Sequence, residues 1–185
     1  MGCEIALDRV WNELNKLSAF EGYKVTFLTD VYDINLSERS VTSRSSTMPA
    51  EDGISLLILH YLIGLHKYGY RPTGEWISFN EIWGGISYFP SYRKKTIQPL
   101  IEMMRRDPEG LINNITSVGG KVEEGGDLAM VLSAFPSIQI KIVMWRGEDE
   151  IPPEVTMLFD KSLADILMTE DIAVLLDTIS RWIDG

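Results

Sequence analysis

The spacing of apolar residues along the chain predicts three long helices. In residues 4–18 and 170–183, apolar side chains recur every three or four positions, which places them on one face of a helix. Thr169 precedes the second of these segments, where a hydroxyl residue typically caps a helix. Residues 54–68 are apolar on nearly every side, so we expect this helix to be buried at the centre of the core.

Alternation of apolar and polar residues predicts strands. Residues 23–28 and 31–37 alternate with a period of two on either side of a short turn, so we expect a hairpin there. Residues 128–135, 138–145 and 154–159 are rich in β-branched and large apolar side chains, which fit the pleated surface of a sheet. We expect these strands to form an antiparallel or mixed sheet.

The remaining segments predict shorter elements. They are a polar loop at 37–47 with a short strand at 40–42, a turn at 69–74, a short strand at 75–79, an irregular aromatic loop at 84–93, two short helices at 96–106 and 108–118, and a turn at 121–127. No internal repeat or long linker divides these elements. We therefore expect a single α+β domain over residues 1–185, with its sheet packed on the central buried helix and with flanking helices.

Composition narrows the class of protein. Hydrophobic residues make up 45% of the 185 residues, which is a normal globular share. The single cysteine, Cys3, excludes an internal disulfide and a multi-cysteine metal site, so we expect a reducing, cytoplasmic location. Glu4 and Asp8 interrupt the apolar stretch that a signal peptide needs. The longest apolar run, 54–65, is shorter than the ~20 residues that span a bilayer, so we expect no membrane segment.

Charge is unevenly distributed along the chain. The net charge is −10, and residues 146–185 hold ten acidic against three basic side chains. An acidic chain is a poor match for nucleic acid, so we expect no such partner. Residues 93–106 hold five basic side chains against one acidic side chain. This basic stretch is either a solvated helix face or a site that holds one anion.

The two histidines do not form a zinc pair. His60 and His66 are six residues apart, which separates them by about 120° around a helix. We therefore expect no metal and no cofactor. His60 is either a buried neutral imidazole held by a backbone or carboxyl partner, or a general acid/base at the floor of a cleft, with carboxylates such as Glu75 or Glu81 nearby.

The aromatic stretch at 76–93 is the best candidate for a binding site. Its glycines would let a ligand approach the backbone, its aromatic rings would form a wall, and its arginine would clamp an anionic group. We expect it to line the main concave pocket, unless it is a hydrophobic cluster that seals the core. The expected ligand-binding residues are His60, Trp76, Trp83, Gly84, Gly85, Tyr88, Tyr92 and Arg93.

Two smaller groups of residues have simple structural explanations. Glu123, Glu124 and Asp127 could bind a divalent ion, but they lack the longer series of oxygen ligands of a calcium loop, which favours an acidic turn. Trp145 and Trp182 belong either to the core or to an oligomer interface.

Several motifs together resemble a known family. They are LILHYL at 57–62, GEWISFNEIWGG at 74–85, GGDLAMVLSAFP ending at Pro136, PPEVTMLFD ending at Asp160 and TEDIAVL in the last helix. In this order they resemble DUF3786, an uncharacterised family of anaerobic bacteria and archaea. The resemblance implies no activity and no catalytic residue. Some relatives resemble fusions to a four-cysteine iron–sulfur segment like that of corrinoid proteins, which implies a partner of the iron–sulfur or corrinoid kind.

Two functions follow from these features. The first is a non-catalytic binding or accessory module that recognises a small anionic ligand or a partner protein, and the lack of any recognisable catalytic motif favours it. The alternative is an enzyme that uses His60 as general acid/base with nearby carboxylates. The two differ in whether His60 meets a second polar group within a cleft.

Overall fold

The amino-terminal part of the chain combines two helices with a small sheet. The computed structural model describes residues 2–148 and 150–185, with side chains from Ile5 onward. Its first elements are α1 (Gly2–Leu17), β1 (Gly22–Phe27), β2 (Asp30–Asn35), β3 (Ser40–Ser43) and α2 (Asp52–Tyr68). The strands pair antiparallel in the order β1-β2-β3. The predicted hairpin is therefore present.

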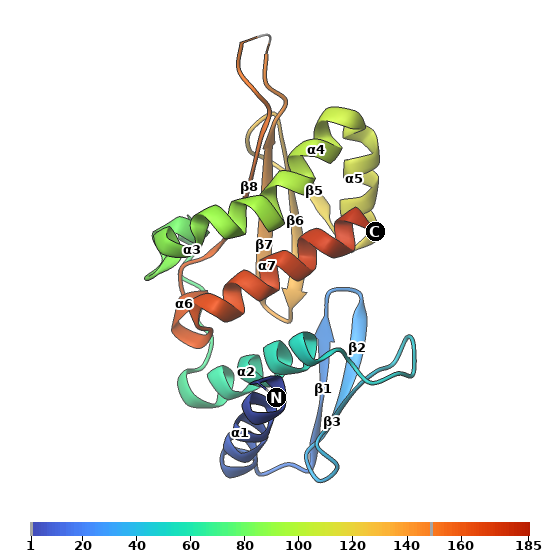
Figure 1. Cartoon of the computed structure of the whole chain (residues 1–185), viewed down its shortest axis with the longest axis vertical. Helices are drawn as coiled ribbons and strands as arrows, with labels where there is room; N and C mark the ends of the chain where they lie inside the picture. The colour runs from blue at the N-terminus through green and yellow to red at the C-terminus, as the bar shows by residue number, and fades with distance from the viewer. Residues whose placement is uncertain (1, 149) are drawn as a thin grey trace.

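The rest of the chain forms a larger sheet covered by helices. Its elements are β4 (Trp76–Ser78), the 3-10 turn η1 (Phe79–Glu81), α3 (Gly85–Tyr92), the π-helical turn η2 (Arg93–Ile97), α4 (Gln98–Arg106), α5 (Pro108–Ser117), β5 (Lys121–Glu123), β6 (Leu128–Phe135), β7 (Ile138–Trp145), β8 (Glu154–Asp160), α6 (Leu163–Ile166) and α7 (Thr169–Asp184). The strands pair antiparallel in the order β4-β8-β7-β6-β5. Figure 1 shows α4 and α7 crossing one face of this sheet.

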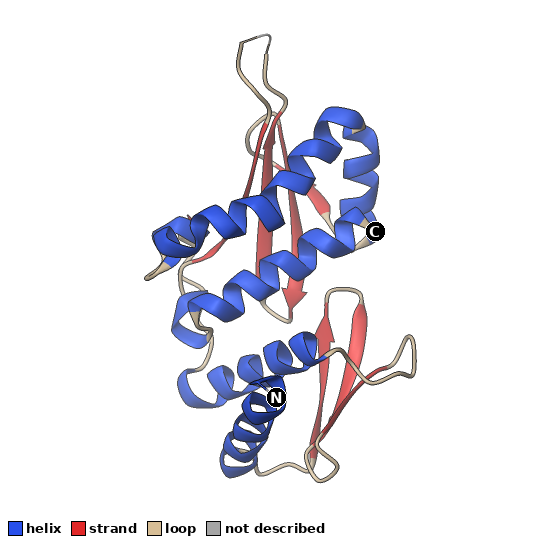
Figure 2. Ribbon diagram, viewed as in Figure 1, coloured by secondary structure: helices blue, strands red, loops and turns tan. Residues whose placement is uncertain are grey.

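The α+β class is confirmed, but the strands form two sheets in the described chain where one sheet was expected (Figure 2). The small sheet forms from neighbouring segments, because β1, β2 and β3 follow one another along the chain and their backbone groups hydrogen-bond to each other. It meets the larger sheet where the Leu28 amide donates to the Ala134 carbonyl oxygen at 2.8 Å. The buried residues of both parts belong to one continuous hydrophobic cluster.

Helix α2 is the buried central helix that the sequence predicts. Leu57, Ile58 and Leu59 have almost no exposed surface. The helix packs against α1, α6 and α7, and its Tyr61 ring stacks on Phe135 of β6 at 4.1 Å between centroids. At Gly64, a Cβ atom would lie 2.2 Å from the Ile166 carbonyl oxygen, so only glycine allows α6 to approach this closely.

Three local predictions were wrong, and one short helix was not anticipated. Residues 84–93 are mostly the helix α3, not an irregular loop, and this helix continues through η2 into α4. The turn expected at 121–127 contains the short strand β5, and α6 was not anticipated. Thr169 is the first residue of α7 and not its cap: Met168 occupies the N-cap position, and the Thr169 hydroxyl donates to the Trp83 carbonyl oxygen at 2.6 Å.

Candidate functional site

Trp83 projects from a loop whose backbone is held on both sides. Before it, Ser78 and Glu81 form a capping box around η1, in which the Ser78 amide donates to the Glu81 carboxylate at 2.7 Å. After it, Gly84 adopts a left-handed conformation with φ of 76°. The Thr169 hydroxyl bonds the Trp83 carbonyl oxygen at 2.6 Å. The loop is therefore fixed to α7, yet the Trp83 side chain is 93% exposed.

Gly84 and Gly85, two of the predicted site residues, shape this loop from the inside. The left-handed φ of Gly84 favours glycine on conformational grounds alone. At Gly85, a Cβ atom would lie 2.0 Å from the Phe79 carbonyl oxygen. Both glycines therefore act on the backbone that presents Trp83. No described contact makes either of them a ligand-binding group.

Trp83 belongs to an exposed apolar surface. Tyr68, Trp83 and Met168 are largely exposed and line one groove of about 350 Å³, which is formed by the end of α2, the loop before α3 and the segment from α6 to α7. Ile86, in the first turn of α3, is also largely exposed. We call the three groove residues Tyr68, Trp83 and Met168 the Trp83 surface. Large exposed apolar patches in a folded protein mark sites of interaction.

The groove beside Trp83 carries negative charge. Asp165 and Glu170 line it, and no lysine or arginine does. Glu170 also accepts a hydrogen bond from the Tyr88 hydroxyl at 3.0 Å, which raises the pKa of Tyr88. A molecule that binds here meets apolar side chains beside carboxylates. The arrangement therefore favours an apolar group with a neighbouring positive charge.

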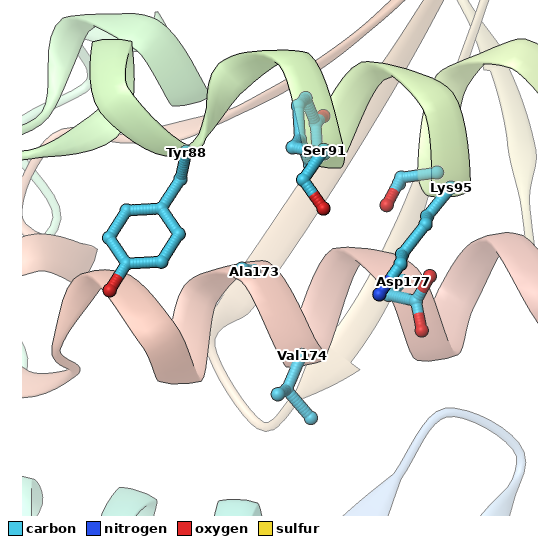
Figure 3. Close-up of a pocket in the computed structure, with 8 residues that line it drawn as sticks. Tyr88, Ser91, Lys95, Ala173, Val174 and Asp177 are labelled. Atoms are coloured by element: carbon cyan, nitrogen blue, oxygen red, sulfur yellow. The ribbon is translucent and has the colours of Figure 1, made fainter.

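Tyr88 and Tyr92 line a different cavity, between α3, η2 and α7. It has a volume of about 170 Å³ and is shown in Figure 3. The Tyr92 ring stacks on Phe79 with 4.4 Å between centroids. Among the described residues, the buried Tyr92 hydroxyl has no hydrogen-bond partner, and burial strongly raises the pKa of this phenol. It is therefore a neutral hydroxyl at neutral pH.

Arg93 is engaged by a carboxylate. Its two terminal nitrogens donate to the two oxygens of Glu154 in β8, at 2.9 and 3.0 Å. This bidentate pair raises the pKa of the guanidinium. An anion would have to compete with Glu154 for this side chain.

Trp76 is the first residue of β4, and its ring lies near Lys141 of β7. It is partly exposed, and the Lys141 ammonium lies 5.9 Å from the centre of its ring, a cation–π contact. The aromatic residues of the predicted site are thus distributed over separate places. Trp83 lies at one groove, Tyr88 and Tyr92 at a second cavity, and Trp76 beside Lys141.

His60 meets a carboxylate other than the two expected. Its Nδ1 lies 2.6 Å from Oδ1 of Asp171, in the first turn of α7. This hydrogen bond raises the pKa of His60, against the opposing effect of burial. Glu75 instead pairs with Lys161 at 3.1 Å, and Glu81 caps η1. The imidazole is one-third exposed and lines neither the Trp83 groove nor the α3–α7 cavity.

Asp160 is a structural carboxylate that the sequence pattern did not single out. It accepts hydrogen bonds from the amides of Thr73, Gly74 and Ser162 and from the hydroxyls of Thr73 and Ser162. These bonds outweigh burial and hold its pKa far below the usual range. It ties the end of β8 to the chain before β4. Two of its partners, Thr73 and Gly74, are 87 and 86 residues away in the sequence, so local spacing could not predict this role.

The described part of the chain also bears on metal binding and on membrane insertion. Among residues 5–148 and 150–185, whose side chains the structure describes, no three His, Cys, Asp or Glu side chains gather as a metal site would require. The predicted absence of a metal stays a prediction. None of the described helices is long and apolar enough to cross a membrane.

These features define an α+β protein with an exposed aromatic surface and a smaller cavity beside it. The chain belongs to the family described as Domain of unknown function (DUF3786), whose model matches residues 12–182. This match covers nearly the whole chain and confirms the resemblance in its motifs. Comparisons with curated proteins and with solved structures found no significant match.

Proposed function

We propose that this protein is a non-catalytic binding or accessory module, and that it binds a partner protein through the Trp83 surface. One observation carries the proposal: Trp83 is 93% exposed on a loop that a capping box, Gly85 and Thr169 hold in place. Exposing a large aromatic ring to water is unfavourable, and a rigid backbone removes the entropy cost of ordering it on binding. Tryptophan is also among the residues that most often dominate binding energy.

The charge of the groove indicates the chemistry of the partner. Its lining has Asp165 and Glu170 but no basic side chain. The expected partner segment therefore presents an apolar anchor next to lysine or arginine. Iron–sulfur and corrinoid proteins are the first partners to test, because the family resemblance implies partners of this kind. We propose that this binding takes place in the cytoplasm, the location that the sequence predicts.

A pair of synthetic peptides tests this proposal. Both contain two leucines, flanked by lysines in one peptide and by glutamates in the other. The lysine peptide should shift the NMR signals of the Trp83 indole and the Met168 methyl group, and the glutamate peptide should not. Trp83→Ala should abolish the response. Trp145→Ala is the matched control, because Trp145 is partly exposed at the end of β7 and lies outside the groove.

Three outcomes would overturn the proposal or its stated chemistry. Equal responses of wild type and Trp83→Ala to the lysine peptide would place the binding elsewhere. A wild type that dimerises in sedimentation measurements, while Trp83→Ala stays monomeric, would make a second copy of this chain the occupant of the groove. Equal binding of both peptides would remove the charge argument and with it the stated chemistry of the partner.

A further inference from the structure

The cavity between α3, η2 and α7 has an apolar floor and a polar rim. Ala173 and Val174 of α7 lie on one side, with the Tyr92 ring on the other. Figure 3 shows Ser91 and Lys95 reaching down from the upper helix toward α7, where Asp177 lies at the same end as Lys95. At about 170 Å³, the cavity is smaller than the ~300–1,000 Å³ of most sites for drug-sized molecules. Its ligand must therefore be small.

The wall of this cavity contains an unusual backbone turn. In η2 the Gln98 amide bonds the Arg93 carbonyl oxygen, five residues back, in place of the four of an α-helix. Turns of this π type are rare and frequent at functional sites. The Ser180 hydroxyl of α7 donates to the Thr96 carbonyl oxygen at 2.7 Å and fixes the turn in place. The cavity is thus held open between two connected walls.

Tyr92 forms part of the cavity wall. Its ring stacks on Phe79, with 4.4 Å between centroids, and this contact fixes the ring in place. The hydroxyl oxygen has no hydrogen-bond partner among the described residues and almost no surface that water can reach. A ligand in the cavity therefore contacts the ring and not the hydroxyl.

The uncompensated charge at the rim is positive. Asp177 is paired with Arg181 of the same helix at 3.2 Å. Within the described chain, Lys95 takes part in no salt bridge, although its side chain lines the cavity. A ligand with one negative group therefore finds a cation here and an apolar floor beside it.

We propose that the α3–α7 cavity binds a small organic carboxylate. The apolar body of the ligand would lie on Ala173, Val174 and the Tyr92 ring, and its carboxylate would pair with Lys95. This site is separate from the Trp83 groove, and no residue lines both. Its presence or absence is therefore independent of the partner-protein proposal.

Benzoate is the probe for this site, with benzamide and inorganic phosphate as comparisons. Benzamide keeps the apolar ring without the charge, and phosphate keeps the charge without the ring. In NMR titrations of the full chain, benzoate should shift the backbone signals of Ala173 and Val174. Both comparison compounds should bind more weakly.

Two lysine variants separate a specific ion pair from general charge. Lys95→Gln should weaken benzoate binding by about twofold to fivefold, the size expected of a solvent-exposed ion pair. Lys94→Gln removes the same charge one residue earlier, outside the cavity lining, and should leave binding unchanged. Ala173→Leu should fill the cavity and abolish the shifts, because Figure 3 shows Ala173 on the side of α7 that faces α3. Because all three side chains are exposed to solvent at least in part, these variants should fold.

The proposal fails if benzoate shifts no signal at the cavity of the wild type. It also fails if the two lysine variants weaken binding equally, since the effect would then be nonspecific attraction. Benzamide binding as tightly as benzoate would remove the carboxylate from the proposal.

Discussion

The imidazole Nδ1 of His60 lies 2.6 Å from Oδ1 of Asp171, and this contact joins the buried helix α2 to the first turn of α7. The second Asp171 oxygen accepts a bond from the Met168 amide at 3.3 Å, which caps α7. One carboxylate thus closes the helix end beside the Trp83 groove and anchors it to the core. The His60–Asp171 pair thus links two helices, and it should make the unfolding free energy depend on pH.

His60 should make stability depend on pH. Its pKa is raised chiefly by the hydrogen bond to Asp171, with further attraction from Asp171 and from Glu13 of α1. The folded protein therefore holds this proton more tightly than the unfolded chain, in which histidine titrates near ~6.5. The added stability is fully present below that pH and is lost as pH rises through the higher folded pKa.

Replacing His60 by glutamine tests this. The difference in unfolding free energy between wild type and His60→Gln, from denaturant melts, should be largest near about pH 6 and shrink toward about pH 9. Asp171→Asn should remove the same pH dependence, together with part of the cap on α7. A difference that stays constant over this range would show that His60 titrates as an ordinary histidine.

Leu59 tests the position of α2 at the centre of the core. Its side chain is completely buried, so Leu59→Ala should lower the unfolding free energy by ~2–5 kcal/mol through lost transfer energy and a cavity. Ile86→Ala is the matched control, because Ile86 is largely exposed and should cost within ~0.5 kcal/mol. Equal and small losses for both variants would mean that α2 is not a core helix.

A pair of glycine substitutions tests the support of the Trp83 loop. Gly85→Ala would place a methyl group 2.0 Å from the Phe79 carbonyl oxygen, so it should destabilise the protein by ~1–3 kcal/mol and displace the loop. At Gly53, in the first turn of α2, an added methyl group would have no other atom within 4 Å, so Gly53→Ala should stabilise the protein by up to ~1 kcal/mol. Thermal melts of both variants measure the two signs. Equal effects would mean that the contact at Gly85 is relieved at no cost.

Helix α2 was predictable because its all-round apolar sequence requires burial whatever it packs against. Helix α3 was not, because residues 84–93 show no helical period and contain Pro90. Its start depends on the fit of Gly85 against Phe79, which is a tertiary contact. Local sequence therefore predicted the elements that carry their own pattern and missed those that neighbours impose.

The candidate site shows the same limit. Clustering in the sequence predicted one site for the aromatic residues. In the structure, Trp83, in the loop before α3, lines the groove, whereas Tyr92, at the end of α3, lines the α3–α7 cavity. Asp171 follows His60 by 111 residues, so no local spacing could pair them. The two carboxylates that the sequence analysis offered as partners of His60, Glu75 and Glu81, have other partners.

Arg93 was predicted to bind an anionic ligand, but in the structure it pairs with Glu154. Its bidentate pair with Glu154 links the end of α3 to β8, and both side chains are nearly half exposed. Water and salt weaken such a pair, so a double-mutant cycle of Arg93→Ala and Glu154→Ala should give a coupling energy of only ~0.2–1 kcal/mol. Arg93→Lys should lose most of it, because an ammonium cannot match the two-pronged geometry.

The same cycle decides whether Arg93 is available to an anion. If Glu154 holds the guanidinium, benzoate affinity should be unchanged in Arg93→Ala, whereas Lys95→Gln weakens it. Glu154→Ala frees the guanidinium and removes a competing negative charge, so any anion site at Arg93 should bind more tightly in that variant. A loss of benzoate binding in Arg93→Ala as large as that in Lys95→Gln would return Arg93 to the binding site and show that the ion pair opens for the ligand.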